Sequence, residues 1–256
     1  MSTRKNIFLY FNALSLYNTN YMTNSDDIEK SFSKTIKSPE LREISLDIAD
    51  VGIDGFLGEG IIKELPVVKI VYALAKGSAS MHDKLFLKKI VSFLTRIKDV
   101  APEKRQNMID DIDNSKKYRI KVGEKLLYIL DSCNDYEASE LVGELFRAFL
   151  TGTISYDDYL SAANVVESLP AGEVEIFVRN YSGEWEDINN VYLGIYTGLY
   201  EISYDPVNID VAENDDYKDL RDGGSKYKAS VDGGTVQAKP NRTGEIIYLV
   251  LKNYFA

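Results

Sequence analysis

The stretch from Asp50 to Leu94 constrains the fold more than any other part of the chain. Four glycines fall within nine residues, an apolar run broken by Pro66 follows them, and a strongly amphipathic segment comes next. Glycine lets the backbone adopt conformations that other residues avoid, and an amphipathic helix has to bury its apolar face. We therefore expect a central pair of helices packed closely through glycine, the alternative being a segment that meets a membrane or a partner. The glycines are Gly52, Gly55, Gly58 and Gly60.

The last part of this stretch predicts an amphipathic helix from about Met81 to Lys98, with Ser80 as its N-cap. Its apolar residues recur at helical spacing on one side, and lysines make the other side basic. We regard three of these lysines as candidates for contact with a partner: Lys84, Lys88 and Lys89.

Most of the remaining chain up to residue 169 also has helical periodicity. Segments 26–57 (broken at Ser38-Pro39), 101–114, 115–132, 135–150 and 156–169 are each predicted to contain helix. The short S-C-N-D link predicts that 115–132 and 135–150 pack as an antiparallel helical hairpin. Residues 22–169 are therefore expected to form a helical bundle.

After Pro170 the character of the chain changes. Helices are expected at 172–181 and 185–201, an acidic loop at 205–222, and a hairpin that turns at Asp232-Gly233-Gly234. A closing helix capped by Thr243 completes an element order similar to that of a winged-helix module. The 185–201 segment carries no Lys or Arg, and its tyrosines suit protein contacts. The candidates there are Tyr192, Tyr196 and Tyr200.

The fold class we expect is mainly α: a helical bundle at 22–169 followed by a small α+β winged-helix-like module at 170–256. Residues 1–21 are expected to be an N-terminal extension. Their basic start and apolar run have the outline of a secretory signal, but Asn12 interrupts the run and no A-x-A site follows. The single cysteine, Cys133, excludes an internal disulfide and fits a reducing compartment. We expect a cytoplasmic protein.

The net charge of −10 is concentrated near the C-terminus. Residues 164–256 hold 8 Lys and Arg against 16 Asp and Glu, which gives −8, while residues 1–163 hold 22 against 24. Nucleic-acid affinity depends largely on neutralising phosphates with basic side chains. We therefore do not expect nucleic acid to be the partner.

No catalytic, cofactor-binding or metal-binding residues can be named from the sequence. The only histidine, His82, has no nucleophile motif to serve, and no G-x-x-x-x-G-K-[ST] or G-x-G-x-x-G motif is present. Two acidic clusters, at 110–113 and 205–222, could hold Mg²⁺ or Ca²⁺ through carboxylates. Charge runs of this kind are more typical of solvated faces and loops.

Three phrases, K-E-L-P-V-V-K-I-V, D-K-L-F-L-K-K-I-V-S-F-L and G-E-L-F-R-A-F-L-T-G-T-I-S-Y, resemble an uncharacterised group of helical bacterial proteins associated with phages and mobile elements. The resemblance covers about residues 22–170. It implies a context such as anti-phage defence, and it supplies no catalytic motif.

The function we predict is that of a non-enzymatic binding or regulatory protein whose partner is another protein or a second copy of itself. One alternative is a membrane-perturbing effector that uses residues 51–77, although Lys63, Glu64 and Lys69 interrupt the apolar run there. The other is an enzyme with a carboxylate metal site. No cofactor is expected.

Overall fold

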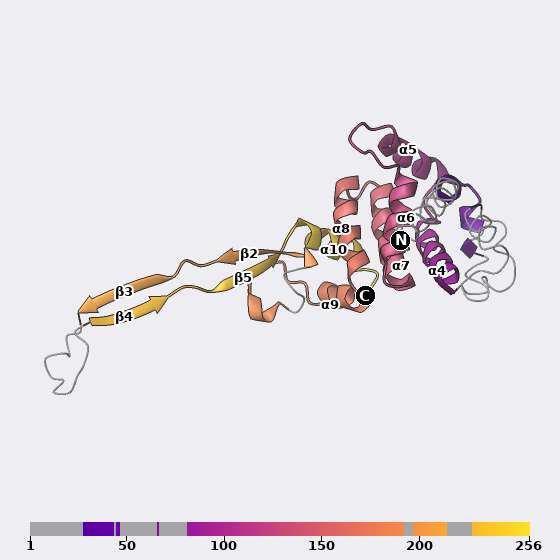
Figure 1. The fold of residues 1–256 in the computed structure, drawn as a ribbon. Helices are drawn as coiled ribbons and strands as arrows, with labels where there is room; N and C mark the ends of the chain where they lie inside the picture. The colour runs from indigo at the N-terminus through magenta and orange to yellow at the C-terminus, as the bar shows by residue number, and fades with distance from the viewer. Residues whose placement is uncertain (1–27, 44, 47–65, 67–80, 192–196, 214–226) are drawn as a thin grey trace, which may run out of the picture.

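A body of packed helices carries one long β-ribbon that projects away from it (Figure 1). The computed structural model describes residues 28–43, 45–46, 66, 81–191, 197–213 and 227–256. The predicted class is confirmed: the chain is mainly α, with a small α+β region in its C-terminal part. The glycine-rich segment and residues 1–21 lie outside the described residues, as do residues 51–77 apart from Pro66.

The helical body begins with helical residues 28–37, 41–43 and 45–46, and the break falls at Ser38-Pro39 as predicted. Seven further α-helices follow in the described part of the chain. They are α4 (Met81–Ile97), α5 (Pro102–Asp113), α6 (Val122–Ser132), α7 (Tyr136–Leu150), α8 (Tyr156–Ser168), α9 (Ala171–Arg179) and α10 (Arg242–Leu251).

Local chemistry explains where several of these helices begin. Pro102 occupies the first turn of α5. The Asp135 side chain accepts a hydrogen bond from the Ala138 amide at the start of α7, and Ser155 and Asp158 form a capping box on α8. The predicted start of α6 at residue 115 is wrong by seven residues, because the Asp113 carboxylate accepts from the Val122 amide and starts the helix there.

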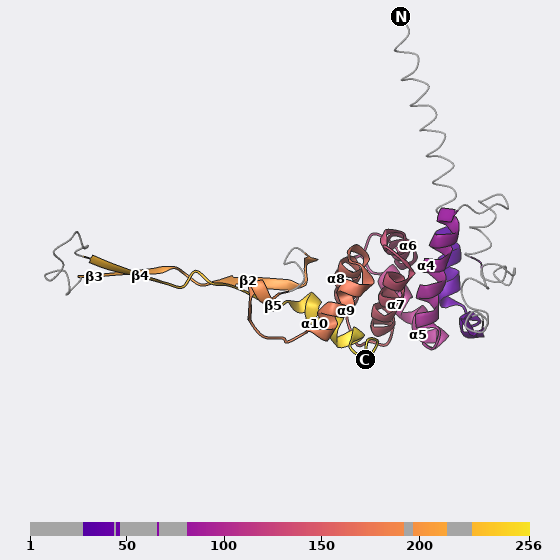
Figure 2. The same cartoon turned by 90° about the horizontal axis from the view of Figure 1, so that it is seen from below.

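Helix α7 lies at the centre of the body, between α4 and α8 (Figure 2). The predicted hairpin of α6 and α7 is wrong, since α7 packs mainly against α4 and α8 while α6 packs against α8 and α4. Aromatic rings join these layers: the Phe146 ring centroid lies 5.6 Å from that of Phe93, 5.5 Å from that of Phe149 and 5.1 Å from that of Tyr159. One continuous apolar core extends from Phe32 to Leu251, across the predicted boundary at 169/170.

Gly143 is the point of closest approach between α7 and α4. A Cβ atom at this position would lie 2.9 Å from the Arg96 Cβ and 3.0 Å from the Phe93 carbonyl oxygen. We expect Gly143→Ala to lower the free energy of unfolding by about 1–3 kcal/mol, since overpacking here outweighs the better helix propensity of alanine. Chemical denaturation measures this, with Gly172→Ala as the matched control because a Cβ there meets nothing within 4 Å. An unchanged midpoint for Gly143→Ala would contradict the close packing.

The strands are β1 (Glu186–Asp187), β2 (Tyr200–Tyr204), β3 (Asn208–Glu213), β4 (Tyr227–Asp232) and β5 (Val236–Pro240). They form a three-stranded sheet of order β1-β5-β2 and a two-stranded sheet of β3 and β4, all antiparallel. The predicted helix at 185–201 is wrong, because β1, a short 3₁₀ turn at Ile188–Asn190 and the start of β2 occupy this segment.

The predicted hairpin turn at Asp232-Gly233-Gly234 is also wrong. Strands β4 and β5 flank this tripeptide without pairing with each other, because β4 pairs with β3 and β5 pairs with β2. The two sheets share one register: Tyr204 faces Val236, Asn208 faces Asp232, and three residues separate these pairs on each side. Residues 200–213 and 227–240 therefore form one long two-stranded ribbon.

No helix among the described residues is long and apolar enough to cross a bilayer. The segment 51–77, on which the alternative of a membrane-perturbing effector depends, is almost wholly outside the described part of the chain.

Candidate protein-interaction arm

The ribbon formed by residues 200–213 and 227–240 projects from the helical body, and every residue of its strands β3 and β4 is exposed; we call it the arm. At about 3.3 Å per residue, the fourteen residues on each side of the arm extend roughly 45 Å. Its inner half, β2 and β5, lies next to α9 and α10, and its outer half, β3 and β4, projects beyond the helices (Figures 1 and 2).

The base of the arm is fixed to the body through Asn241. The Asn241 side-chain oxygen accepts from the amides of Thr243 (2.9 Å) and Gly244 (3.1 Å), which caps α10. Its amide nitrogen donates to the Gly198 carbonyl at 2.9 Å, and its backbone N–H donates to the Leu199 carbonyl, also at 2.9 Å. One residue thus joins the end of β5, the start of β2 and the first turn of α10, so the arm leaves the body in a defined direction.

An irregular segment separates the inner and outer halves. The Asp205 amide donates to the Thr235 carbonyl at 3.0 Å, and the Gly234 amide donates to the Asp205 carbonyl at 3.2 Å. Gly233 and Gly234 have φ values of +85° and +76°, which side-chain-bearing residues rarely adopt. A Cβ at Gly233 would lie 2.1 Å from the Pro206 carbonyl oxygen, so glycine is required at this position.

The outer half of the arm has one apolar face. Alternation along β3 and β4 places Ile209 and Val211 on the same face as Ala229 and Val231. Ile209 and Val211 are each 63% exposed and Val231 is 67% exposed. At the outer end of the same face Glu213 lies opposite Tyr227. The opposite face carries Asn208, Asp210, Ala212, Lys228, Ser230 and Asp232.

Both edges of the outer half are open as well. Strands β3 and β4 form a sheet by themselves, so each has an edge that no other described strand pairs with. A two-stranded ribbon is marginally stable alone in water, and open edges recruit further strands. Exposed apolar surface together with open edges is typical of a surface that contacts another polypeptide.

The predicted contact residues fall in three different places. Tyr200 begins β2 at the base of the arm, so it does not continue a helical face with Tyr192 and Tyr196, which lie outside the described residues. Lys84 is exposed on α4. The Lys88 ammonium lies 4.3 Å from the centre of the Tyr136 ring, and Lys89 donates to the Asp131 carbonyl at 3.0 Å, so both make contacts within the body.

Sequence reasoning missed the outer arm because it assigned 205–222 to an acidic loop. The apolar alternation of Ile209 and Val211 between Asn208, Asp210 and Ala212 was the signal that could have found β3.

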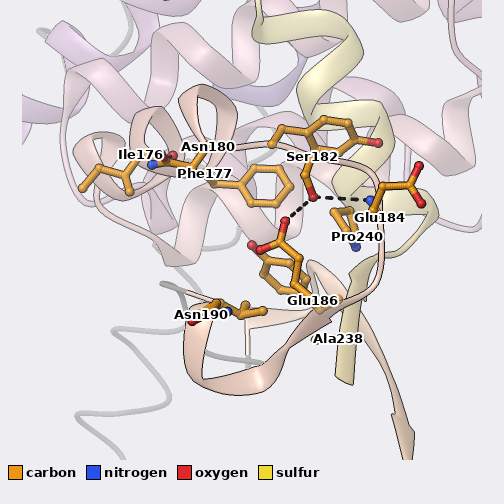
Figure 3. A pocket seen from close by; sticks show the side chains of 12 residues that line it. Ile176, Phe177, Asn180, Ser182, Glu184, Glu186, Asn190, Ala238 and Pro240 are labelled. Atoms are coloured by element: carbon orange, nitrogen blue, oxygen red, sulfur yellow. Dashed lines mark hydrogen bonds between the residues drawn. The ribbon is translucent and has the colours of Figure 1, made fainter. Parts of the chain in front are cut away.

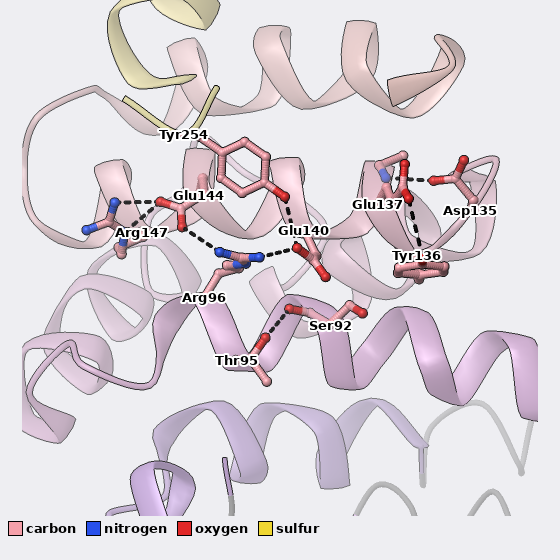
Figure 4. Close-up of polar contacts among 11 residues, drawn as sticks. Ser92, Thr95, Arg96, Asp135, Tyr136, Glu137, Glu140, Glu144, Arg147 and Tyr254 are labelled. Atoms are coloured by element: carbon pink, nitrogen blue, oxygen red, sulfur yellow. Dashed lines mark hydrogen bonds and ion pairs between the residues drawn. The ribbon is translucent and has the colours of Figure 1, made fainter. Parts of the chain in front are cut away.

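A cluster of charged side chains on α4 and α7 serves the internal packing of the body (Figure 4). Arg96 on α4 pairs with Glu140 on α7 and, at 3.8 Å, with Glu144. Arg147 donates to Glu144 at 2.5 Å, and the Tyr254 hydroxyl donates to Glu140 at 2.9 Å. Burial, with Glu140 adding to it, raises the pKa of Tyr254 to about 12. The cluster therefore joins the C-terminal segment to α4 and α7.

The remaining residues considered for metal binding or catalysis either contact other side chains and backbone groups or lie apart from one another. Asp110 pairs with Lys37 at 2.6 Å, and Asp113 accepts from the Val122 amide at 2.8 Å. Within the described ranges no group of His, Cys, Asp and Glu side chains is arranged to hold a metal ion, and residues 214–222 of the second acidic cluster lie outside those ranges. His82 is exposed near the start of α4. Burial raises the pKa of the Cys133 thiol to about 11, which suits a core residue.

The fold and the arm define this chain as a helical protein that carries a projecting β-arm. Comparison with protein-family models, with curated proteins and with solved structures gave no match to the chain.

Proposed function

We propose that this chain is a non-enzymatic protein-binding protein, and that the outer arm binds the outer arm of a second copy. The observation that carries the proposal is an exposed sheet at the end of a projecting arm, with apolar residues on one face and two edges that no other described strand pairs with. Adding strands at a free edge supplies backbone hydrogen bonds, and side chains on the same face of the extended sheet then pack against those of the neighbouring strand.

Strand β4 is complementary to itself. If two copies of β4 pair antiparallel about Ser230, Lys228 of each copy faces Asp232 of the other. On the opposite face of the same sheet, Ala229 faces Val231. Opposite charges and apolar residues that face each other across strands each contribute about 0.2–1 kcal/mol.

Strand β3 lacks this complementarity. Antiparallel pairing of two β3 strands about Asp210 sets that carboxylate against its own copy, and pairing about Val211 sets Ile209 against Glu213. Pairing through β4 gives a symmetric dimer with a four-stranded sheet, which meets the size at which sheets become stable in water. Two six-residue edges are small beside a standard interface, so we expect reversible, concentration-dependent association.

We expect Lys228→Asp to weaken self-association by about tenfold or more, because the introduced carboxylate then faces Asp232 of the second copy. The double variant Lys228→Asp/Asp232→Lys exchanges the two charges and restores complementarity, so it should dimerise as the natural chain does. Sedimentation equilibrium over a range of concentrations measures this against the monomer mass of 28.9 kDa.

Lys252→Asp is the matched control. Lys252 is exposed just after α10, so this substitution makes the same change in charge at a position away from the arm. A chain that stays monomeric at every concentration contradicts the proposed dimer. If Lys228→Asp dimerises normally while Val211→Asp does not, the apolar faces meet and the β4 edges do not. A role in anti-phage defence stays a prediction that rests on the sequence resemblance alone.

A further inference from the structure

A cavity of about 490 Å³ lies where helix α9 meets the base of the arm (Figure 3). Its walls come from α9, the segment that follows α9, and strands β1, β2 and β5. This volume falls within the range of small-molecule and side-chain binding pockets. The cavity is separate from the outer arm, so an inference about it stands independently of the proposed dimer.

Aromatic rings form one part of the lining. The Phe177 ring stands edge-on to Tyr200 at 5.7 Å and to Tyr181 at 6.0 Å between ring centroids. Tyr181 is stacked on Tyr248 of α10 at 4.0 Å, with the rings 7° from parallel. Ring contacts with α9, β2 and α10 therefore fix the orientations of these aromatic side chains.

Carboxylates form the other part. Glu186 accepts a hydrogen bond from the Ser182 hydroxyl, and Glu184 lies two residues before it (Figure 3). None of the described residues that line the cavity is Lys or Arg. The pKa of Tyr200 is raised, mainly by burial and further by the negative charge of Glu186. The cavity thus has a negative potential next to aromatic surface.

Elsewhere in this protein, an aromatic ring and a carboxylate together bind a guanidinium group. The Arg96 guanidinium lies 4.9 Å from the centre of the Tyr254 ring and pairs with the carboxylate of Glu140. The cavity offers the same two groups, an aromatic ring and a carboxylate, without a cation from the described lining.

We propose that this cavity binds a cationic group, a guanidinium or an ammonium, between the aromatic rings and Glu186. The ring faces attract the cation through their quadrupoles, and the carboxylate accepts its N–H groups. Two sources supply such a group: a free small organic cation, or an Arg or Lys side chain of a bound polypeptide.

Trp185 reports on this site without labelling. It is the only tryptophan of the chain, it is 42% exposed, and it lies between the two carboxylates in the sequence. The full chain is titrated with N-acetyl-arginine amide and with acetyl-Gly-Arg-Gly-amide, and Trp185 emission and binding heat are followed. The citrulline forms of both ligands keep the shape and remove the charge.

We expect the arginine ligands to bind and the citrulline ligands to bind at least about tenfold more weakly, as the loss of a charge-assisted pair predicts. Glu186→Gln should weaken arginine binding by about the same factor. Glu201→Gln is the matched control, because Glu201 is exposed on β2 beside Tyr200 and does not line the cavity. It should leave binding unchanged.

Tighter binding of the peptide than of the free amide identifies the occupant as a polypeptide side chain, and equal binding identifies a free small cation. The proposal is overturned if neither arginine ligand binds at about 10 mM, a concentration that detects even very weak sites. It is also overturned if citrulline binds as well as arginine, or if Glu186→Gln binds arginine as the natural chain does. Circular dichroism of each variant confirms that the fold is kept.

Discussion

Arg105→Ala is expected to lower the free energy of unfolding by about 3 kcal/mol, because each buried carbonyl left without a donor costs about 1–3 kcal/mol. For a chain of this size such a loss lowers the melting temperature by about 6–12 °C. Differential scanning calorimetry or urea denaturation measures it.

The physical reason lies in what the Arg105 guanidinium contacts. The side chain is 1% exposed, and it donates to the carbonyl oxygens of Val100 and Ser38, each at 2.5 Å. Longer contacts of 3.5 Å reach the carbonyls of Ile97 and Lys98. These carbonyls follow two different helices, α4 and residues 28–37, so a single cation satisfies the C-terminal ends of both.

Burial lowers the pKa of Arg105. The ordinary pKa of arginine is so high that the guanidinium nevertheless stays charged. Arg105→Lys keeps the charge and loses the planar fork, so we expect a smaller loss of stability than for alanine. Lys104→Ala is the matched control: Lys104 is exposed, and its ammonium reaches only the Thr151 carbonyl, at 3.1 Å, among the described residues. That change should stay within about 0.5 kcal/mol of the natural chain. A similarly small effect of Arg105→Ala would contradict the role assigned to it.

Arg105 also shows where prediction from the sequence ended. Helices α4, α5, α7, α8 and α9 were predicted within a few residues, because apolar periodicity and capping residues are local signals. Nothing local distinguishes Arg105 from Lys104, since the carbonyls that bury the guanidinium come partly from a helix some seventy residues earlier. The packing of α7 against α4 in place of α6 depends on the same kind of distant contact.

The strand pairing of the arm was predicted wrongly because it too depends on contacts between residues that are distant in the sequence. Asp232-Gly233-Gly234 has the residue types of a two-residue hairpin turn, and the strands on either side alternate as in a hairpin. The actual partners of these strands, β3 and β2, lie 14–40 residues earlier in the chain, and pairing over such a distance leaves no mark near the turn. Tyr200, the one predicted contact tyrosine among the described residues, lines the cavity at the arm base from a strand.

Gly233→Ala is expected to disorder the outer arm while leaving the helical body intact. The new Cβ would lie 2.1 Å from the Pro206 carbonyl oxygen at a φ of +85°, so the backbone has to move. Strain of this kind costs about 1–3 kcal/mol, and a two-stranded ribbon has little stability to lose. Amide hydrogens in β3 and β4 should then exchange at least about tenfold faster, since 1.4 kcal/mol corresponds to a factor of ten.

The body supplies the internal reference for this experiment. Amides of α7 should exchange at their natural rates, and the melting temperature should stay unchanged, because the outer arm contributes no residue to the apolar core of the described chain. Gly172→Ala is the control for the substitution itself, since a Cβ there meets nothing within 4 Å.

The same variant separates the arm from the body as the site of self-association. If dimerisation depends on a rigid β4 edge, Gly233→Ala loses it together with the protection of the outer arm. If the outer arm loses protection and the dimer persists, the contact lies elsewhere, and the β4 pairing of Lys228 with Asp232 is wrong. If the amides of the arm keep their natural exchange rates, then glycine is not required at position 233. This result contradicts the predicted strain, and the variant then says nothing about self-association.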